Sequence, residues 1–295
     1  MERLVLLAVV GLLAQFVDGS LGMAYGLTSA SLLVGLGYAP ALVSATVHTA
    51  ELATTFTSGV FHSRFGNTDW RIVLLLGIPG AIGAFAGAAV LSHVPGELAR
   101  PYVAGVLFAL GVLLLWRFTF MDGSSTPTIK RMVPKRLLFP LGLFAGFFDA
   151  SGGGGWGPIT TPTLLVEQHT EPRKVVGSVD TSEFAVSLAA TIAFLIILGP
   201  ESINLMWLAA LVLGGLIAAP IAAWLVGRIP RQLLGVLIAG AILVSNARTL
   251  ASVLLLTPEA TVVAYLALVL LWVVALALLL VRARLASLVG SGSTG

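Results

Sequence analysis

The sequence of 295 residues contains no cysteine, and only 10% of its residues are charged. The absence of cysteine excludes disulfides, thiolate metal sites and cysteine redox chemistry. The scarcity of charge, together with a hydrophobic fraction of 58%, excludes an ordinary soluble domain, in which roughly 45–50% of residues are apolar. The formal net charge of +3 does not indicate nucleic-acid binding, because basic residues of membrane proteins collect in cytoplasmic loops. The sequence therefore predicts an integral membrane protein.

One stretch of the sequence occurs twice. Residues 14–26 read A-Q-F-V-D-G-S-L-G-M-A-Y-G, and residues 145–157 read A-G-F-F-D-A-S-G-G-G-G-W-G, at an offset of 131. A second similarity, at an offset of 132, relates residues 45–51 to residues 177–183. A hydrophobic chain with a long internal repeat, each copy interrupted by glycines, is typical of secondary transporters.

Seven segments are long enough to cross a bilayer, which takes about 20 apolar residues in a helix. They are approximately residues 40–62, 70–92, 99–118, 177–198, 203–226, 231–256 and 259–281. Four shorter segments form two pairs, 3–17 with 22–37 and 137–149 with 154–168. The pairs are interrupted at Asp18-Gly19 and at residues 149–155. Each short segment spans roughly 22 Å, so each pair forms either two tilted crossings or a re-entrant hairpin.

The predicted fold is an all-α polytopic membrane protein with two inverted-topology repeats. Either form of the short pairs leaves an odd number of crossings in each repeat, so the second copy is expected to sit upside down relative to the first. The short or re-entrant helices are expected to meet at the membrane centre. The boundaries are 1–118 for the first repeat, 119–135 for a cytoplasmic linker, 136–256 for the second repeat, 257–284 for an extra helix and 285–295 for a tail that looks like a linker scar.

Basic residues indicate the orientation in the membrane. When the predicted crossings are followed along the chain, 13 of the 16 lysines and arginines fall on one side. That side is expected to be cytoplasmic. The prediction is a multi-pass protein of the cytoplasmic (inner) membrane of a prokaryote, with the N-terminus outside and the C-terminus inside.

The predicted substrate site lies at the two interruptions. The run from Gly152 to Gly155 directly precedes a helix start, where free amides at the positive end of the helix dipole suit an anion. Residues 19–22 are a poorer version of this run in the first copy. The alternative is that these glycines only let helices pack closely, as scattered glycines such as Gly83 and Gly87 do.

The remaining members of the predicted substrate site are hydroxyl donors, two aromatic residues at equivalent places and one arginine. The whole set is Gly19, Ser20, Gly22, Tyr25, Ser151, Gly152, Gly153, Gly154, Gly155, Trp156, Thr160, Thr161 and Arg248. Tyr25 and Trp156 either form an aromatic wall of the pocket or simply pack. Arg248 either pairs with an anion or a carboxylate, or extends its side chain to the membrane interface.

Ionisable residues inside a membrane are candidates for function. Asp18 and Asp149 lie at the interruptions and are expected to cap the helices that follow. Two further pairs occupy matching positions at i, i+3 spacing, which puts each pair on one helix face. These pairs, His48 with Glu51 and Asp180 with Glu183, are expected to gate transport or relay protons; metal binding and ordinary polar contacts are the alternatives. No role is assigned to His62, His93 and His169, which lie in or beside predicted loops.

The strongest motif is the second interruption, residues 147–158, in which F-F-D-A-S precedes four glycines and W-G-P. Together with the first copy it resembles the TauE/SafE sulfite exporter family, also called the 4-toluene sulfonate uptake permease family, over roughly residues 3–256. The first copy departs from the family pattern at Leu21, Met23, Ala24 and Leu27, which stand at glycine or proline places. The resemblance implies transport of sulfite or of C2 sulfonates such as sulfoacetate across the cytoplasmic membrane, usually as export.

The predicted function is export of a small sulfur-containing anion by alternating access, without a cofactor, a metal or enzymatic activity. The alternative is a proton-coupled carrier or a metal-cation transporter that uses the intramembrane histidine and carboxylates. An intramembrane protease with Asp18 and Asp149 as a dyad, or a membrane scaffold, are the rivals from other classes. The expected partners are the anionic substrate and the lipid bilayer, with no nucleic acid; homodimer formation is left open.

Overall fold

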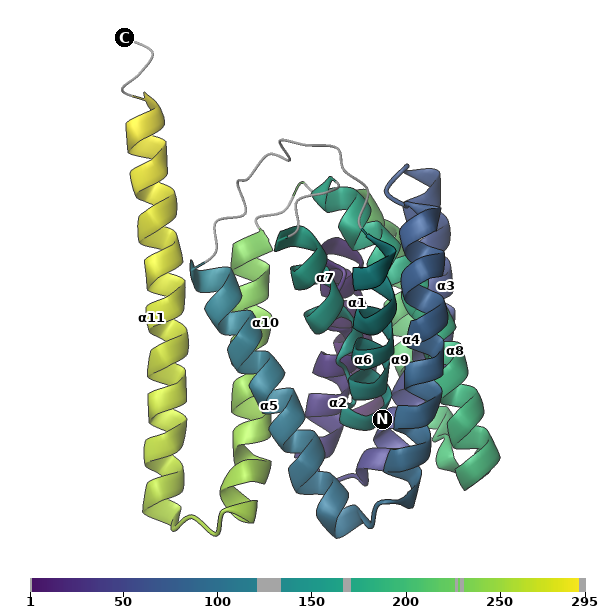
Figure 1. Ribbon diagram of the computed structural model, residues 1–295. Helices are drawn as coiled ribbons and strands as arrows, with labels where there is room; N and C mark the ends of the chain where they lie inside the picture. Colours follow the sequence, from purple (N-terminus) through teal and green to yellow (C-terminus); the bar gives the residue numbers. More distant parts are fainter. Residues whose placement is uncertain (1, 121–133, 167–170, 226–227, 229–230, 292–295) are drawn as a thin grey trace.

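The computed structural model describes residues 2–120, 134–166, 171–225, 228 and 231–291, and within these ranges every regular element is helical (Figure 1). The elements of the first half are α1 (Glu2–Leu21), α2 (Tyr25–Gly35), α3 (Pro40–Arg64), α4 (Trp70–His93) and α5 (Gly96–Phe120). Those of the second half are α6 (Lys135–Gly152), α7 (Trp156–Val166), α8 (Pro172–Leu198), η1 (Pro200–Ser202), α9 (Leu205–Leu225), α10 (Arg231–Val253) and α11 (Pro258–Ser291). The all-α fold class predicted from the sequence is confirmed.

Several helix boundaries follow from local chemistry. Pro40 and Pro172 begin α3 and α8 at the position where a missing amide hydrogen costs nothing. Asp69 caps α4, because its side chain accepts a hydrogen bond from the amide of Arg71 at 3.0 Å. Gly153 ends α6 with a φ of 84°, the left-handed conformation that glycine adopts without strain.

The helices before both interruptions extend further than the sequence suggests. The first was expected at Asp18-Gly19, but α1 continues to Leu21 because the amide of Gly22 still donates to the carbonyl of Asp18, at 2.5 Å. Likewise α6 continues past Asp149 to Gly152. The breaks are therefore residues 22–24 and 153–155, and each aspartate lies in the last turn of the helix that precedes its break.

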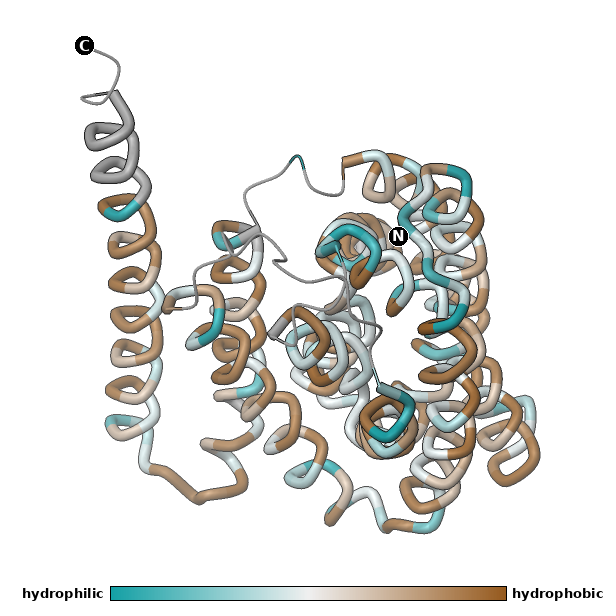
Figure 2. Tube along the Cα trace, turned by 45° about the horizontal axis from the view of Figure 1, so that its top comes forward, coloured by the Kyte–Doolittle hydropathy of each residue, from teal (hydrophilic) through white to brown (hydrophobic). Residues whose placement is uncertain are grey.

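Seven helices in the described ranges are long and apolar enough to cross a membrane. They are α1, α4, α5, α8, α9, α10 and α11. The helix α3 has 25 residues but carries many hydroxyl and ionisable side chains, and α2 and α7 have eleven residues each, or about 16 Å. Hydrophobic residues cover most of α11, which stands at the edge of the molecule beside α10 (Figure 2).

Two helix pairs approach so closely that their backbones touch. On α4 and α6, a Cβ added to Gly83 would collide with the carbonyl of Leu143, and one added to Gly146 with the carbonyl of Gly80. On α1 and α9, a Cβ added to Gly214 would collide with the carbonyl of Ala8. Small residues allow this approach, which is how helices gain van der Waals contact in lipid. Each pair joins a helix of one sequence copy to a helix of the other.

We expect Gly146→Ala to destabilise the protein, because its new methyl group has no room against the backbone of α4. Overpacking of this kind costs about 1–3 kcal/mol. The matched control is Gly105→Ala in α5, where an added Cβ meets no atom within 4 Å. Thermal melting in detergent measures both; equal melting temperatures for the two variants would show that the α4–α6 contact is not tight.

Candidate functional site

The two breaks of the chain pack directly against one another. An added Cβ on Gly154 would collide with the amide nitrogen of Leu27, and one on Gly157 would collide with the backbone of Met23. The hydroxyl of Thr161 donates to the carbonyl oxygen of Gly22 at 2.5 Å, so a hydrogen bond also joins α7 to the first break. The N-termini of α2 and α7 therefore lie together where the two breaks pack against each other. We call this place the break junction.

The backbone at the breaks adopts conformations that favour glycine. Gly22, Gly153 and Gly154 have φ angles of 69°, 84° and 147°. In the first break Ala24 has a φ of 104°, which is uncommon for a residue with a side chain and costs energy. The backbone thus explains the family pattern at this position, where Ala24 stands in a glycine place.

The predicted hydroxyl donors are all engaged with backbone carbonyls in this conformation. Ser20 donates to Phe16, Ser151 to Phe147 and Thr160 to Trp156, each within its own helix. Each hydroxyl has a single hydrogen to donate, so these three groups offer a ligand only lone pairs here.

The two aromatic residues beside the junction are buried and hydrogen-bonded. The Tyr25 hydroxyl donates to the carbonyl of Leu211 at 3.3 Å, and the Trp156 ring nitrogen donates to that of Val179 at 3.1 Å. They anchor the starts of α2 and α7 to α9 and α8.

Three further glycines of the predicted site serve helix packing, and the last predicted residue has a side chain that the structure does not describe. Gly19 faces Ala222 of α9, and Gly152 faces Val106 of α5. Gly155 lies against the backbone of α6. Arg248 belongs to α10, and its side chain lies outside the part of the structure that is described.

Five carboxylates and a histidine surround the junction in two buried groups. The first cluster is His48, Glu51 and Asp149, and the second cluster is Asp18, Asp180 and Glu183. In each cluster one potential ligand atom per residue lies within 4.8 Å of the others. Each cluster combines the aspartate before one break with the i, i+3 pair of the other sequence copy. Asp18 and Asp149 therefore belong to different clusters rather than to one protease-like dyad.

The first cluster contains a proton-sharing contact. The Nδ1 of His48 lies 2.8 Å from the Ser44 carbonyl oxygen, which only accepts, so Nδ1 carries a hydrogen. Its Nε2 lies 3.2 Å from Oδ2 of Asp149. Two lone pairs would repel at that distance, so a proton lies between them. The other oxygen, Oδ1 of Asp149, accepts from the amide of Trp156 at 3.0 Å and so caps α7 across the break.

Glu51 extends from the first cluster to the break junction. Its Oε2 accepts a hydrogen bond from Ser187 at 3.0 Å, whereas its Oε1 has no partner. An added Cβ on Gly26 would lie 2.8 Å from that free oxygen. The absence of a side chain at Gly26 thus leaves room for the Glu51 carboxylate at the start of α2.

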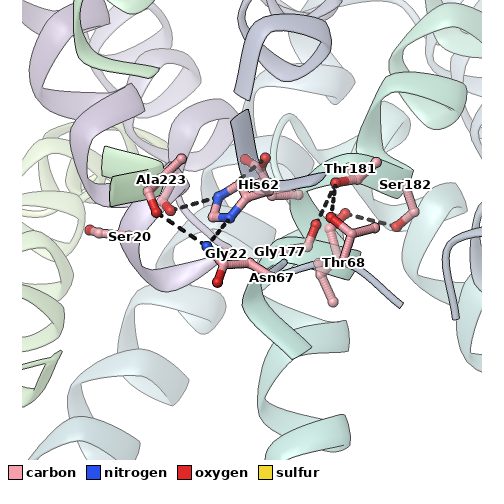
Figure 3. Close-up of polar contacts among 12 residues, drawn as sticks. Ser20, Gly22, His62, Asn67, Thr68, Gly177, Thr181, Ser182 and Ala223 are labelled. Carbon is pink, nitrogen blue, oxygen red and sulfur yellow. Dashed lines mark hydrogen bonds and ion pairs between the residues drawn. The ribbon is translucent and has the colours of Figure 1, made fainter. Parts of the chain in front are cut away.

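No role was predicted for His62, because the residue was expected in or beside a loop. The structure corrects this interpretation, since His62 is fully buried in α3, where it faces Asn67 (Figure 3). Its Nε2 lies 3.7 Å from Oδ2 of Asp180. Its Nε2 donates to the carbonyl of Gly19 at 2.9 Å, and its Nδ1 accepts from the Asn67 amide at 3.3 Å. With one ring nitrogen donating and the other accepting, His62 is held as a neutral imidazole.

Two cavities of the described structure lie between the helices around the breaks. One of about 730 Å³ lies between α5, α6 and α7 and is lined by residues that include Val106, Arg117, Phe148, Pro158 and Thr163. The other, of about 510 Å³, lies between α3, α4 and α8 and is lined by residues that include Thr55, Arg64, Trp70, Gly77 and Thr181. No glycine of residues 19–22 or 152–155 lines either of these two cavities.

Comparison with known proteins connects this arrangement to transporters. The family model described as "Sulfite exporter TauE/SafE" matches residues 7–249. A relative from Bacillus subtilis (strain 168), "Probable membrane transporter protein YtnM", is 54% identical over 252 residues, which cover 85% of this chain and 83% of the relative. A second protein of that organism, "Probable membrane transporter protein YdhB", is 29% identical over 130 residues. These residues cover 44% of this chain and 53% of that protein. No solved structure matches.

We expect the two hydrogen-bonding roles of Asp149 to be separable by substitution. In Asp149→Asn the amide oxygen can still accept from Trp156 and the amide nitrogen can donate to Nε2 of His48, so thermal stability should stay close to that of the original protein. In Asp149→Ala the buried amide of Trp156 loses its partner, which costs about 1–3 kcal/mol. Melting curves of the two variants in detergent test this; an alanine variant as stable as the asparagine variant would refute the capping role.

Proposed function

The chain belongs to the TauE/SafE sulfite exporter family, and we propose that it exports a small sulfur-containing anion, sulfite or a C2 sulfonate such as sulfoacetate, across the cytoplasmic membrane. The observation that carries the proposal is the packing of the two breaks against each other inside a bundle of apolar helices. Irregular backbone at membrane depth is tolerated only where it is buried in protein or lines a wet cavity.

The proposed mechanism is alternating access at the break junction. The two breaks are packed together here, and in this mechanism that arrangement is the state between two openings. Separation of the breaks removes the hydrogen bond from Thr161 to Gly22 and frees the Thr161 hydroxyl for an anion. The starts of α2 and α7 then offer backbone amides and the positive ends of two helix dipoles, which suit an oxyanion.

Inverted repeats are part of this proposal. In Figure 1 the hairpin of α6 and α7 opens toward the end of the bundle where α5 finishes. The break junction also receives one break from each sequence copy. Both features favour two halves of opposite orientation that rock against each other.

Electrical driving force supports export as the direction. An inside-negative potential favours exit of an anion by about 2.3 kcal/mol per charge per 100 mV. The five carboxylates around the junction oppose anion binding unless protons or a cation neutralise part of their charge. A second candidate function, transport of a cation through these clusters, is favoured by the same acidic surroundings.

Reconstituted vesicles test the proposed function. We expect vesicles that contain the protein to release sulfite or sulfoacetate faster than protein-free vesicles, and faster still under a potential that drives anions out. Acetate and lactate should leave no faster than from protein-free vesicles. Flux of divalent cations without anion flux would support the second candidate instead.

Two variants connect that flux to the junction. Gly154→Ala places a methyl group against Leu27 and strains the backbone, so the rate should fall to that of protein-free vesicles. Thr161→Val, a milder change, removes the hydroxyl that bonds Gly22 and should slow release in a protein that still folds. Gly105→Ala serves as control and should transport normally; normal flux in both junction variants would place the pathway elsewhere.

The proposed orientation has its own test, because the chain contains no native cysteine. We expect a membrane-impermeant maleimide to label Gly96→Cys, exposed at the start of α5, in intact cells. Lys135→Cys, exposed at the start of α6, should react only after the membrane is permeabilised. The reverse pattern would place the N-terminus inside.

A further inference from the structure

We propose that the second cluster, the carboxylates of Asp18, Asp180 and Glu183, binds a divalent metal cation that prefers oxygen ligands, such as Mg²⁺, Mn²⁺ or Ca²⁺. The site is formed where the last turn of α1 meets one face of α8. It adjoins the break junction, and its occupation does not depend on which anion the protein carries.

The geometry of the cluster suits a metal ion. Its three potential ligand oxygens lie within 4.8 Å of one another. Oxygen atoms bound to Ca²⁺ lie about 2.3–2.6 Å from the ion, so two of them on opposite sides are about 5 Å apart. Small side-chain movements are therefore enough for all three carboxylates to contact one ion.

Unsatisfied polar atoms concentrate at this point of the structure. Both oxygens of Asp18, both of Asp180 and Oε2 of Glu183 are buried without a hydrogen bond of normal geometry. Such groups are rare in native proteins, and each calls for a missing water or ion.

Neutral groups around the carboxylates are also left without partners. The Ser58 hydroxyl and the side-chain amide of Gln15 are fully buried without a hydrogen bond of normal geometry, and the Ser58 hydroxyl lies close enough to Asp180 to interact with it. An added Cβ on Gly19 would lie 3.3 Å from the Ser58 oxygen and 3.6 Å from the Gln15 nitrogen, so both groups flank the turn that carries Asp18. Their oxygens are additional ligands for the same ion.

No positive side chain compensates these carboxylates within the described part of the chain. The charged groups that act on Glu183 are all acids, namely Asp18, Glu51, Asp149 and Asp180. The neighbouring His62 is held neutral, because its Nε2 hydrogen is donated to Gly19 and its Nδ1 accepts from Asn67 (Figure 3). Three ionised carboxylates buried together are stable only with an opposite charge nearby, and a bound cation supplies that charge.

The first cluster differs in this respect and serves as an internal control. A single proton shared by His48 and Asp149 already compensates much of its charge, and Ser187 bonds one oxygen of Glu51. The second cluster has only oxygen ligands, which select hard cations such as Mg²⁺, Ca²⁺ and Mn²⁺ over metals that favour imidazole or thiolate.

The test is direct binding to the purified protein after treatment with EDTA, in buffer that contains no sulfur anion. Titration calorimetry with Mg²⁺ and Ca²⁺, and electron paramagnetic resonance with Mn²⁺, should detect one saturable site per chain. The bound ion should raise the melting temperature as its concentration rises, whereas choline chloride at equal ionic strength should not.

Substitutions locate the ion. Asp180→Asn and Glu183→Gln should each weaken binding at least about tenfold, and Ser58→Ala should weaken it less. Glu51→Gln in the first cluster removes a charge that acts on Glu183 without being a ligand, so it should weaken binding much less than Asp180→Asn or Glu183→Gln. Wild-type protein that binds no divalent cation, responds to Na⁺ alone, or changes stability only with pH would overturn the proposal. Loss of binding in Glu51→Gln with retention in Asp180→Asn would also overturn it. Sulfite release from vesicles is a separate measurement, so failure of either proposal can be recognised without the other.

Discussion

Close backbone approach at glycines holds this protein together. Where α4 meets α6, and where α1 meets α9, glycines remove the side chains that would otherwise keep the helices apart. Lipid tails are as apolar as leucine, so burial of apolar surface gives little drive for helix association, and tight contact must supply it. Both contacts join the two sequence copies. They therefore fix the relative position of the two breaks, which could not touch if either helix pair were one side chain further apart.

The polar interior follows from the same construction. The helices α3 and α8 lie between the tightly packed pairs and carry the hydroxyl and ionisable side chains that a lipid-facing helix cannot accommodate. The last turn of α1 places Asp18 beside α8, and the last turn of α6 places Asp149 beside α3. The result is two acidic groups of related construction but different chemistry, because a histidine stands at position 48 where the second copy has Asp180.

Periodicity and composition were sufficient to predict the all-helical membrane fold, because long apolar segments have few alternatives in lipid. They placed the end of the helix before each break too early, since an aspartate beside a small residue resembles a helix end when a hydrogen bond such as that from Gly22 to Asp18 is not visible. His62 was missed for a related reason: α3 continues two residues past it, and burial by α8 and α9 is a tertiary effect. The hydroxyls near the breaks were identified, but their engagement with carbonyls depends on the conformation and could not be read from residue types.

Each cluster takes residues from both halves of the chain, and this has a consequence for how the two halves depend on each other. Neither half contains a complete cluster. Asp18 forms its cluster with the acids of α8, and His48 forms its cluster with the aspartate of α6. A polypeptide cut between α5 and α6 would yield fragments that are each incomplete, yet complementary. The two halves thus behave as permanently fused subunits of a heterodimer, and an ancestral single copy with this design would have required a second molecule to complete it.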